Sequence, residues 1–201
     1  HEPVCGIFRR MPGLLLSLNT SPLRELTMLD GRSVTSGILK RAVAGPRKVE
    51  LLRIEGDAQA DAAVHGGPAK AMYAYPSEHY PFWATLRAQF GVAAWGDSLP
   101  FGALGENLTL AGLLEIDVWV GDVLRFPDCA LGVSGPRLPC YKLDAALGFE
   151  QASNAMAARA WCGFYLAVHE PGTISAGEPF ELVPGPRAIG VTELFRARIG
   201  S

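Results

Sequence analysis

Glycine and proline interrupt this chain so often that long helices and long strands have little room. The sequence contains 23 glycines and 15 prolines among 201 residues. Proline fixes φ and removes a backbone donor, whereas glycine tolerates the positive φ of tight turns. The apolar segments between these residues are short. The chain therefore favours many short elements joined by turns, which is more typical of a β fold than of a helical one.

Eight of the short apolar segments are expected to form strands. They cover residues 14–19, 49–54, 71–75, 116–120, 123–126, 130–133, 164–168 and 180–183. In addition, residues 32–43 resemble a hairpin that carries Lys40 on its second arm. Short strands at regular spacing predict a closed or nearly closed β-barrel, because closure removes the exposed strand edges. The expected fold class is mainly β with a few flanking helices (α+β).

A helix is expected from Ser77 to Phe90. Apolar side chains recur there at helical spacing, namely Tyr80, Trp83, Leu86 and Phe90. Ser77 suits the N-cap, and Gly91 follows the last apolar residue. The aromatic stripe is best explained by core packing rather than by contact with a cofactor. The alanine-rich segment 151–160 is also helix-competent, and residues 191–198 can start a helix.

Charge and cysteine spacing exclude several classes of protein. The net charge of −2 gives no global basic field for nucleic acid or an anionic membrane. No apolar segment approaches the roughly 18 residues of a membrane span. The four cysteines are scattered and form no C-x-x-C pair, so a zinc knuckle or a disulfide scaffold is not expected (Cys5, Cys129, Cys140, Cys162). We expect a cytoplasmic protein in a reducing setting.

The domain organisation is expected to be simple. Met11 directly precedes the first apolar segment, so we interpret residues 1–10 as an N-terminal extension or residues added for expression. The remaining residues, 11–201, are expected to form a single domain, since this length is sufficient for one hydrophobic core.

The segment from Gly135 to Lys142 is the strongest candidate for chemistry. Its two prolines predict a stiff loop outside the middle of any sheet or helix. Cys140 lies in this segment between Arg137 and Lys142. Nearby positive charge favours the thiolate, which is the form that acts as nucleophile or metal ligand. Without such a context, a lone cysteine is more often a small buried apolar residue.

A second polar segment, from Asp57 to Pro68, is expected to be a surface loop. It contains His65 followed by Gly66 and Gly67, and Lys70 comes shortly after it. Paired glycines allow close approach of a ligand or expose amide groups to an anion. His65 could instead be an ordinary turn residue, and the lysines could be solvated surface charges.

Several ordered motifs resemble the MOSC domain, and within it the YiiM-type branch of hydroxylaminopurine-resistance proteins. The matching segments, spread over about residues 11–194, are Gly37-Ile38-x-Lys40, Glu55-Gly56-Asp57-x-Gln59-Ala60-Asp61, His65-Gly66-Gly67-Pro68-x-Lys70-Ala71, Gly105-Glu106-Asn107-Leu108-Thr109, Gly121-Asp122 and Pro136-Arg137-x-Pro139-Cys140-x-Lys142. The chain differs from the branch at Trp161-Cys162-Gly163 and ends where that branch usually continues into a further helical region.

This resemblance implies a MOSC-type β-barrel that binds the molybdenum cofactor, molybdopterin, with Cys140 as the metal ligand. A thiolate suits a redox-active metal. The expected phosphate and pterin contacts are Lys40, Lys70, Arg137 and Lys142, with Glu106 and Asn107 reading the pterin edge. His65 would bind the cofactor or donate a proton. The alternative for Glu106 is that it only supports the turn before Asn107.

The resemblance also implies an oxidoreductase that reduces small N-hydroxylated compounds with electrons from a separate reductase. Two other functions stay open. One is a carrier that holds the cofactor or its sulfur without turnover, and the other is a metal-free transferase that uses Cys140 and His65. Neither nucleic acid nor a membrane is an expected partner, and a homodimer is an open alternative to a monomer.

Overall fold

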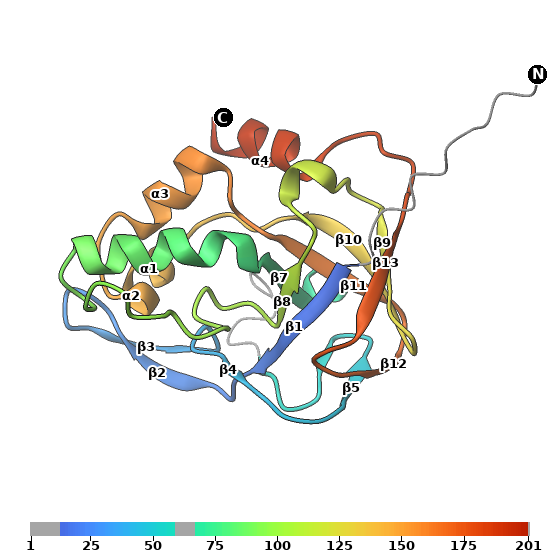
Figure 1. Cartoon of the computed structure of the whole chain (residues 1–201), viewed down its shortest axis with the longest axis horizontal. Coiled ribbons are helices and arrows are strands. Elements are labelled where there is room, and N and C mark those ends of the chain that lie inside the picture. The colour runs from blue at the N-terminus through green and yellow to red at the C-terminus, as the bar shows by residue number, and fades with distance from the viewer. Residues whose placement is uncertain (1–12, 59–66, 201) are drawn as a thin grey trace, which may run out of the picture.

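The protein is built around a closed barrel of seven strands, as described by a computed structural model of residues 13–58 and 67–200 (Figure 1). Around the barrel the strands follow the order β13-β9-β10-β11-β7-β8-β1, and β1 pairs again with β13. Their bounds are Gly13–Thr20 (β1), Met72–Pro76 (β7), Leu108–Ala111 (β8), Val123–Arg125 (β9), Ala130–Pro136 (β10), Phe164–Glu170 (β11) and Pro179–Val183 (β13). The predicted mainly-β barrel with flanking helices is confirmed.

The seven strands pair antiparallel except at one seam. β7 and β8 run parallel. A parallel pair needs a crossover, because a short hairpin can join only antiparallel strands. Helix α1 (Tyr80–Gln89) lies in that crossover, where the aromatic stripe predicted a helix. Its Tyr80 and Trp83 are buried, but Phe90 follows the helix and is 50% exposed. The helix is preceded by a 3-10 turn, Ser77–His79, so His79 rather than Ser77 occupies its N-cap.

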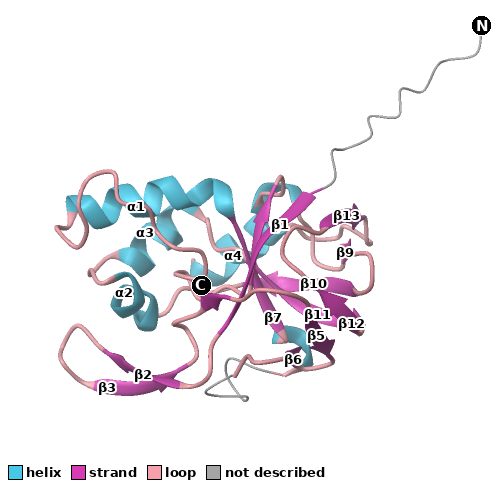
Figure 2. Ribbon diagram, turned by 60° about the horizontal axis from the view of Figure 1, so that its bottom comes forward, coloured by secondary structure: helices cyan, strands magenta, loops and turns pink. Residues whose placement is uncertain are grey.

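The remaining helices cover limited parts of the barrel. They are α2 (Tyr141–Leu147), α3 (Ala152–Arg159) and α4 (Val191–Ile199). Figure 2 shows α1, α2 and α3 gathered on one side of the barrel, with the hairpin of β2 (Arg24–Thr27) and β3 (Ser33–Ser36) below α2. Helix α4 packs against β10. Within the described residues, no helix is both long and apolar enough to cross a bilayer.

The short strands outside the barrel differ from several expectations. β3 pairs with β2, so the hairpin does not lie within residues 32–43, and Lys40 instead precedes β4 (Arg41–Ala42), which pairs with β1. The expected strand 49–54 is broken into β5 (Arg47–Glu50) and β6 (Arg53–Ile54). Leu51 and Leu52 form the exposed turn between them. β5 also pairs with β12 (Gly172–Ile174).

Two other predictions were wrong for identifiable reasons. Residues 116–120 form no strand: a 3-10 turn covers Glu115–Asp117, and Ile116 is 66% exposed. The apolar residues there alternate as they would on a strand face, but the 3-10 turn breaks the alternation. The expected loop 135–142 is shorter than predicted, because β10 extends through Pro136 and α2 begins at Tyr141. Pro136 is tolerated because it ends its strand.

The turn that leads into β11 depends on a glycine. Gly163 has a φ of +61°, and a Cβ placed there would lie 2.3 Å from the backbone oxygen of Ala74. We expect Gly163→Ala to lower the free energy of unfolding by more than about 3 kcal/mol, because left-handed strain and a backbone clash add together. Urea unfolding measures this change.

Gly177→Ala is the matched control. Gly177 has a φ of +92°, but a Cβ there would meet nothing within 4 Å. Its substitution should cost only the conformational term of about 1 kcal/mol. Equal effects of the two substitutions would contradict the role assigned to the close approach at Gly163.

Candidate functional site

One end of the barrel holds a pocket at which six segments of the chain meet. The lining residues are Ser36, Gly37, Ile38, Lys40, Asp57, Ala58, Lys70, Met72, Tyr73, Gly105, Asn107, Arg137, Leu138, Cys140, Lys142 and Tyr165. They come from the start of β7 and β11, the approach to β8, the end of β10 with the start of α2, and the loops that follow β3 and β6. Barrel closure therefore brings together motifs that are far apart in the sequence.

Cys140 reaches this pocket from the connection between β10 and α2. It is half-buried, with its backbone extended at the N-cap of α2. Pro136 ends β10, and Pro139 precedes the cysteine, so the chain has little freedom between the two elements. The thiol thus occupies a defined place in the wall of the pocket.

Two cations in the pocket lie against aromatic rings. The Arg137 guanidinium carbon lies 4.8 Å from the ring centroid of Tyr73, and the Lys70 ammonium lies 5.6 Å from that of Tyr165. Both distances allow cation–π attraction. Arg137 is 6% exposed and donates a hydrogen bond to the carbonyl oxygen of Leu104. Because Tyr165 and Tyr73 are register partners on β11 and β7, the strand pairing fixes the two ring–cation pairs side by side.

A buried ion pair forms another wall of the pocket. The Lys40 ammonium lies 2.5 Å from the Asp57 carboxylate, and their side chains are 8% and 2% exposed. Burial lowers the pKa of Lys40, while the charge of Asp57 opposes that shift. Asp57 also accepts hydrogen bonds from the backbone of Ser21 and from the side chain of Asn107.

Asn107 connects the pocket to the barrel. Its side-chain nitrogen donates to Asp57 and to the Asn19 carbonyl, and its side-chain oxygen accepts from the Tyr73 backbone. Both amide donors are therefore occupied within the protein. One lone pair of the oxygen is left over by this count, since an amide oxygen has two. Asn107 is better placed to hold the pocket together than to supply two new contacts.

Glu106 does not line the pocket. The carboxylate is fully buried and accepts hydrogen bonds from the Tyr80 and Thr109 hydroxyls and from the backbone of Gly102 and Leu104. Burial raises the pKa of Glu106, and these hydrogen bonds oppose the rise. The structure therefore corrects its expected contact with a pterin and supports the alternative, a residue that shapes the turn before Asn107.

The fold thus brings together six of the eight predicted site residues. Cys140, Lys40, Lys70, Asn107, Arg137 and Lys142 line one pocket. Glu106 lies behind it, and His65 falls outside the described residues. Sequence reasoning missed Asp57, Tyr73 and Tyr165 as lining residues. Asp57 belongs to the Glu55-Gly56-Asp57 motif, but the tyrosines occupy strand positions that carry no signal of which face meets the pocket.

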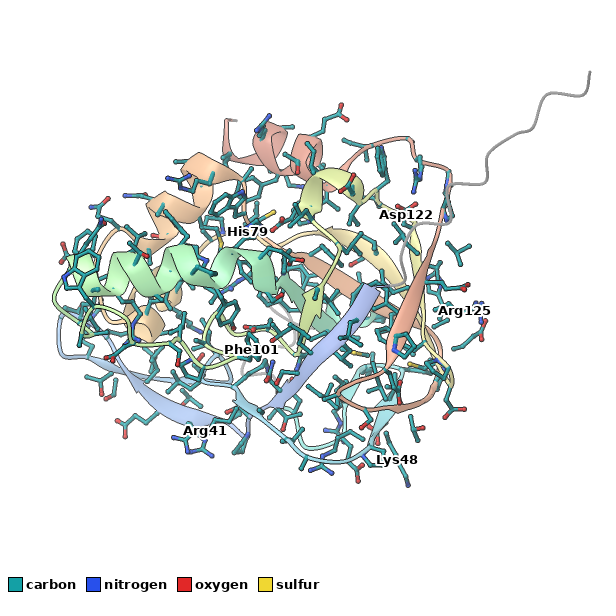
Figure 3. The ribbon with its side chains drawn as sticks, viewed as in Figure 1. Arg41, Lys48, His79, Phe101, Asp122 and Arg125 are labelled. Carbon is teal, nitrogen blue, oxygen red and sulfur yellow. The ribbon has the colours of Figure 1, made fainter. Side chains whose placement is uncertain are left out.

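Among the described residues, the two histidines and the other two cysteines do not line the pocket. His79 is 5% exposed. It lies 2.9 Å from Glu115, and its ring stacks on Trp161. Figure 3 shows it in the interior, whereas Arg41, Lys48 and Arg125 point outward. Cys129 and Cys162 are buried in the apolar core, and His169 is exposed.

Comparisons with known proteins agree on one family. The model of the MOSC domain matches residues 61–181. The uncharacterized protein YflK of Bacillus subtilis is 39% identical over 178 residues, which cover 88% of this chain and 76% of YflK. A protein of Gibberella moniliformis named "Reductase" is 30% identical over 93% of this chain, but the match spans only 33% of that protein. The crystal structure of YiiM from Geobacillus stearothermophilus superimposes with a TM-score of 0.72 at 31% identity, covering 93% of this chain and 84% of YiiM.

The difference in burial among the cysteines predicts selective modification. Burial raises the pKa of the Cys129 thiol to about 12 and raises that of Cys162 as well. At neutral pH we expect iodoacetamide to modify Cys140 at least about tenfold faster than Cys129 or Cys162, because only thiolate reacts and access is required. Mass spectrometry of the digested protein measures each rate. In urea the three rates should converge, and equally fast labelling of Cys162 in the native protein would contradict its burial.

The hydrogen bonds of Glu106 predict a large stability effect. Glu106→Ala removes an acceptor from four buried donors, of which the Gly102 N–H keeps the Tyr80 hydroxyl as a second acceptor. We expect a loss of roughly 3 to 5 kcal/mol in the free energy of unfolding. Urea unfolding followed by circular dichroism measures it. Glu25→Ala, on the exposed face of β2, should leave the urea midpoint unchanged. A small effect at Glu106 would mean that water replaces the carboxylate.

Proposed function

This chain belongs to the MOSC domain family, and from that premise we propose that its pocket binds the molybdenum cofactor and that the protein reduces N-hydroxylated compounds. The supporting observation is the pocket itself. The thiol of Cys140 lies in the same cavity wall as four basic side chains, Lys40, Lys70, Arg137 and Lys142. A soft sulfur ligand beside several cations suits a metal carried on an anionic organic group.

The donor chemistry of the pocket fits such a cofactor. Molybdopterin carries a phosphate and a flat polar pterin. Arg137 can offer a planar fork of N–H donors to phosphate, and the lysines offer point charges. Within residues 13–58 and 67–200, no group of three or more His, Cys, Asp or Glu side chains is placed to hold a metal ion by itself. The described donors therefore suit a metal that arrives with ligands of its own.

The proposed reaction converts R–NHOH to R–NH₂ and water, and it consumes two electrons and two protons. When bound, the cofactor would supply the two-electron redox centre. Cys140 would hold the metal, and Arg137 with the lysines would hold the phosphate. The protons require donors. Lys40 lines the pocket and can serve as one, and His65, which lies outside the described residues, stays a candidate on the strength of its motif. The electrons would come from a separate reductase.

Metal analysis tests this proposal. The chain is produced in a host that makes the molybdenum cofactor, and molybdenum is measured per mole of protein for the wild type and for Cys140→Ser. We expect the serine variant to lose most of its molybdenum, because a hydroxyl is a poor ligand for a soft site. Reduction of an aromatic hydroxylamine with an artificial electron donor should fall in parallel.

Cys129→Ser is the matched control, since its thiol is buried away from the pocket and its substitution should leave the molybdenum content unchanged. Equal molybdenum in the wild type and in Cys140→Ser would remove the thiol from the metal. A protein that binds molybdenum through Cys140 but never turns over would instead favour the carrier function.

A further inference from the structure

A buried carboxylate inside a pocket lined by cations calls for an explanation. Asp57 is 2% exposed and lies among the residues that line this pocket. We infer that Asp57 is a positioning residue, which fixes the Lys40 ammonium toward an anionic ligand and does not serve to cancel the charge of the pocket. This inference rests on the proposed function only in assuming that the ligand is anionic.

Asp57 is tied to the barrel on two sides. One carboxylate oxygen accepts the backbone N–H of Ser21, directly after β1, at 2.9 Å. The other accepts the side-chain N–H of Asn107, directly before β8, also at 2.9 Å. Since β1 and β8 are paired barrel strands, the carboxylate has a fixed place relative to the barrel wall. It is therefore a rigid support.

Lys40 depends on that support. Its ammonium lies 2.5 Å from the same carboxylate oxygen that accepts from Ser21. A lysine ammonium has three N–H donors, and Asp57 takes one of them. Among the described residues, no second hydrogen-bond acceptor is recorded for Lys40, so two donors remain to face a ligand. A flexible lysine stem would otherwise lose much rotamer entropy on binding an anion.

Asp57 also keeps Lys40 charged. The side chain of Lys40 is 8% exposed, and burial disfavours the ammonium form. The charged groups that act on it are Asp57 and Glu106, which favour the ammonium, and Arg137, which disfavours it. Removal of the Asp57 charge would shift this balance toward neutral lysine and so weaken the attraction for an anion.

The two explanations of Asp57 predict effects of opposite sign. If Asp57 only cancels charge, Asp57→Asn should strengthen anion binding, because the pocket gains one positive charge, and Asp57→Glu should change nothing. If Asp57 positions Lys40, both variants should weaken binding. Asp57→Glu keeps the charge but displaces the carboxylate by one methylene, so it tests position alone.

The test uses inorganic phosphate and isothermal titration calorimetry at neutral pH. The chain is purified from a host that cannot make the molybdenum cofactor, so that the pocket is accessible to the probe. We expect the Kd for phosphate to rise about fivefold or more in both Asp57 variants, the scale of a weakened charged hydrogen bond. Asp128→Asn, which removes a charge far from the pocket, should leave Kd unchanged. Tighter binding by Asp57→Asn, or an unchanged Kd in Asp57→Glu, would overturn the inference.

A double-mutant cycle separates positioning from general damage to the fold. Lys40→Gln alone should weaken phosphate binding about tenfold. In that background Asp57→Asn should change Kd by less than about twofold, because Asp57 has no Lys40 ammonium left to position. A full effect of Asp57→Asn without Lys40 would assign Asp57 a merely structural role. Should the Asp57 variants fail to fold, Lys40→Gln still decides, since an unchanged Kd would show that Lys40 does not face the anion.

This experiment fails independently of the proposed function. Phosphate binding that follows the expected pattern, together with no molybdenum in the chain produced in the cofactor-making host, would support the inference and contradict the cofactor. Molybdenum bound through Cys140, together with a phosphate Kd that does not change in the Asp57 variants, would support the cofactor and contradict the inference. Absence of phosphate binding to the wild-type chain would overturn the inference.

Discussion

A cluster of buried polar side chains at one end of the barrel is the constraint on which the candidate site depends. Polar groups without water must find partners inside the protein, because each unsatisfied group costs on the order of 1–3 kcal/mol. Asn19 donates to the Glu106 carbonyl and to Thr109, while Asn107 donates to Asn19 and to Asp57. These hydrogen bonds join β1, β8 and the Asp57 loop. Asp57 and Asn107 of this cluster line the pocket, so the geometry of the pocket follows from hydrogen bonds that the buried groups must make.

The sequence predicted the architecture because the relevant signals are local. Turn residues separate short apolar segments, and Tyr80 and Trp83 at helical spacing mark α1. Such signals depend only on residues close in the sequence, so they can be interpreted before the fold is known. They fail where a segment has the right pattern but the wrong surroundings. Ile116 alternates with other apolar residues, yet it faces solvent from a 3-10 turn.

The candidate site was predictable in its membership but less so in its internal roles. The ordered motifs contain Cys140, Arg137 and Lys40, and barrel closure brings these residues together. The roles of Glu106 and Asn107 could not be separated, because both lie on the bent segment before β8, where Gly105 has a φ of +85°, and no strand alternation assigns their sides. Gly105 and Asn107 line the pocket, whereas Glu106 turns away and binds the preceding loop. The barrel decides which of these residues faces the pocket, and no local sequence pattern carries that information.

Asp57 illustrates that the net charge of a pocket does not by itself determine how well the pocket binds an anion. Counting charges alone, an acid among Lys40, Lys70, Arg137 and Lys142 only weakens the attraction for an anion. The same acid prevents a buried lysine from adopting many rotamers and helps to retain its proton. Three of these four cations lie against a group that restrains them: Lys40 against Asp57, Arg137 against Tyr73 and Lys70 against Tyr165. For a ligand with a fixed arrangement of oxygens, ordered donors can be worth more than one additional unit of charge, since less entropy is lost on binding.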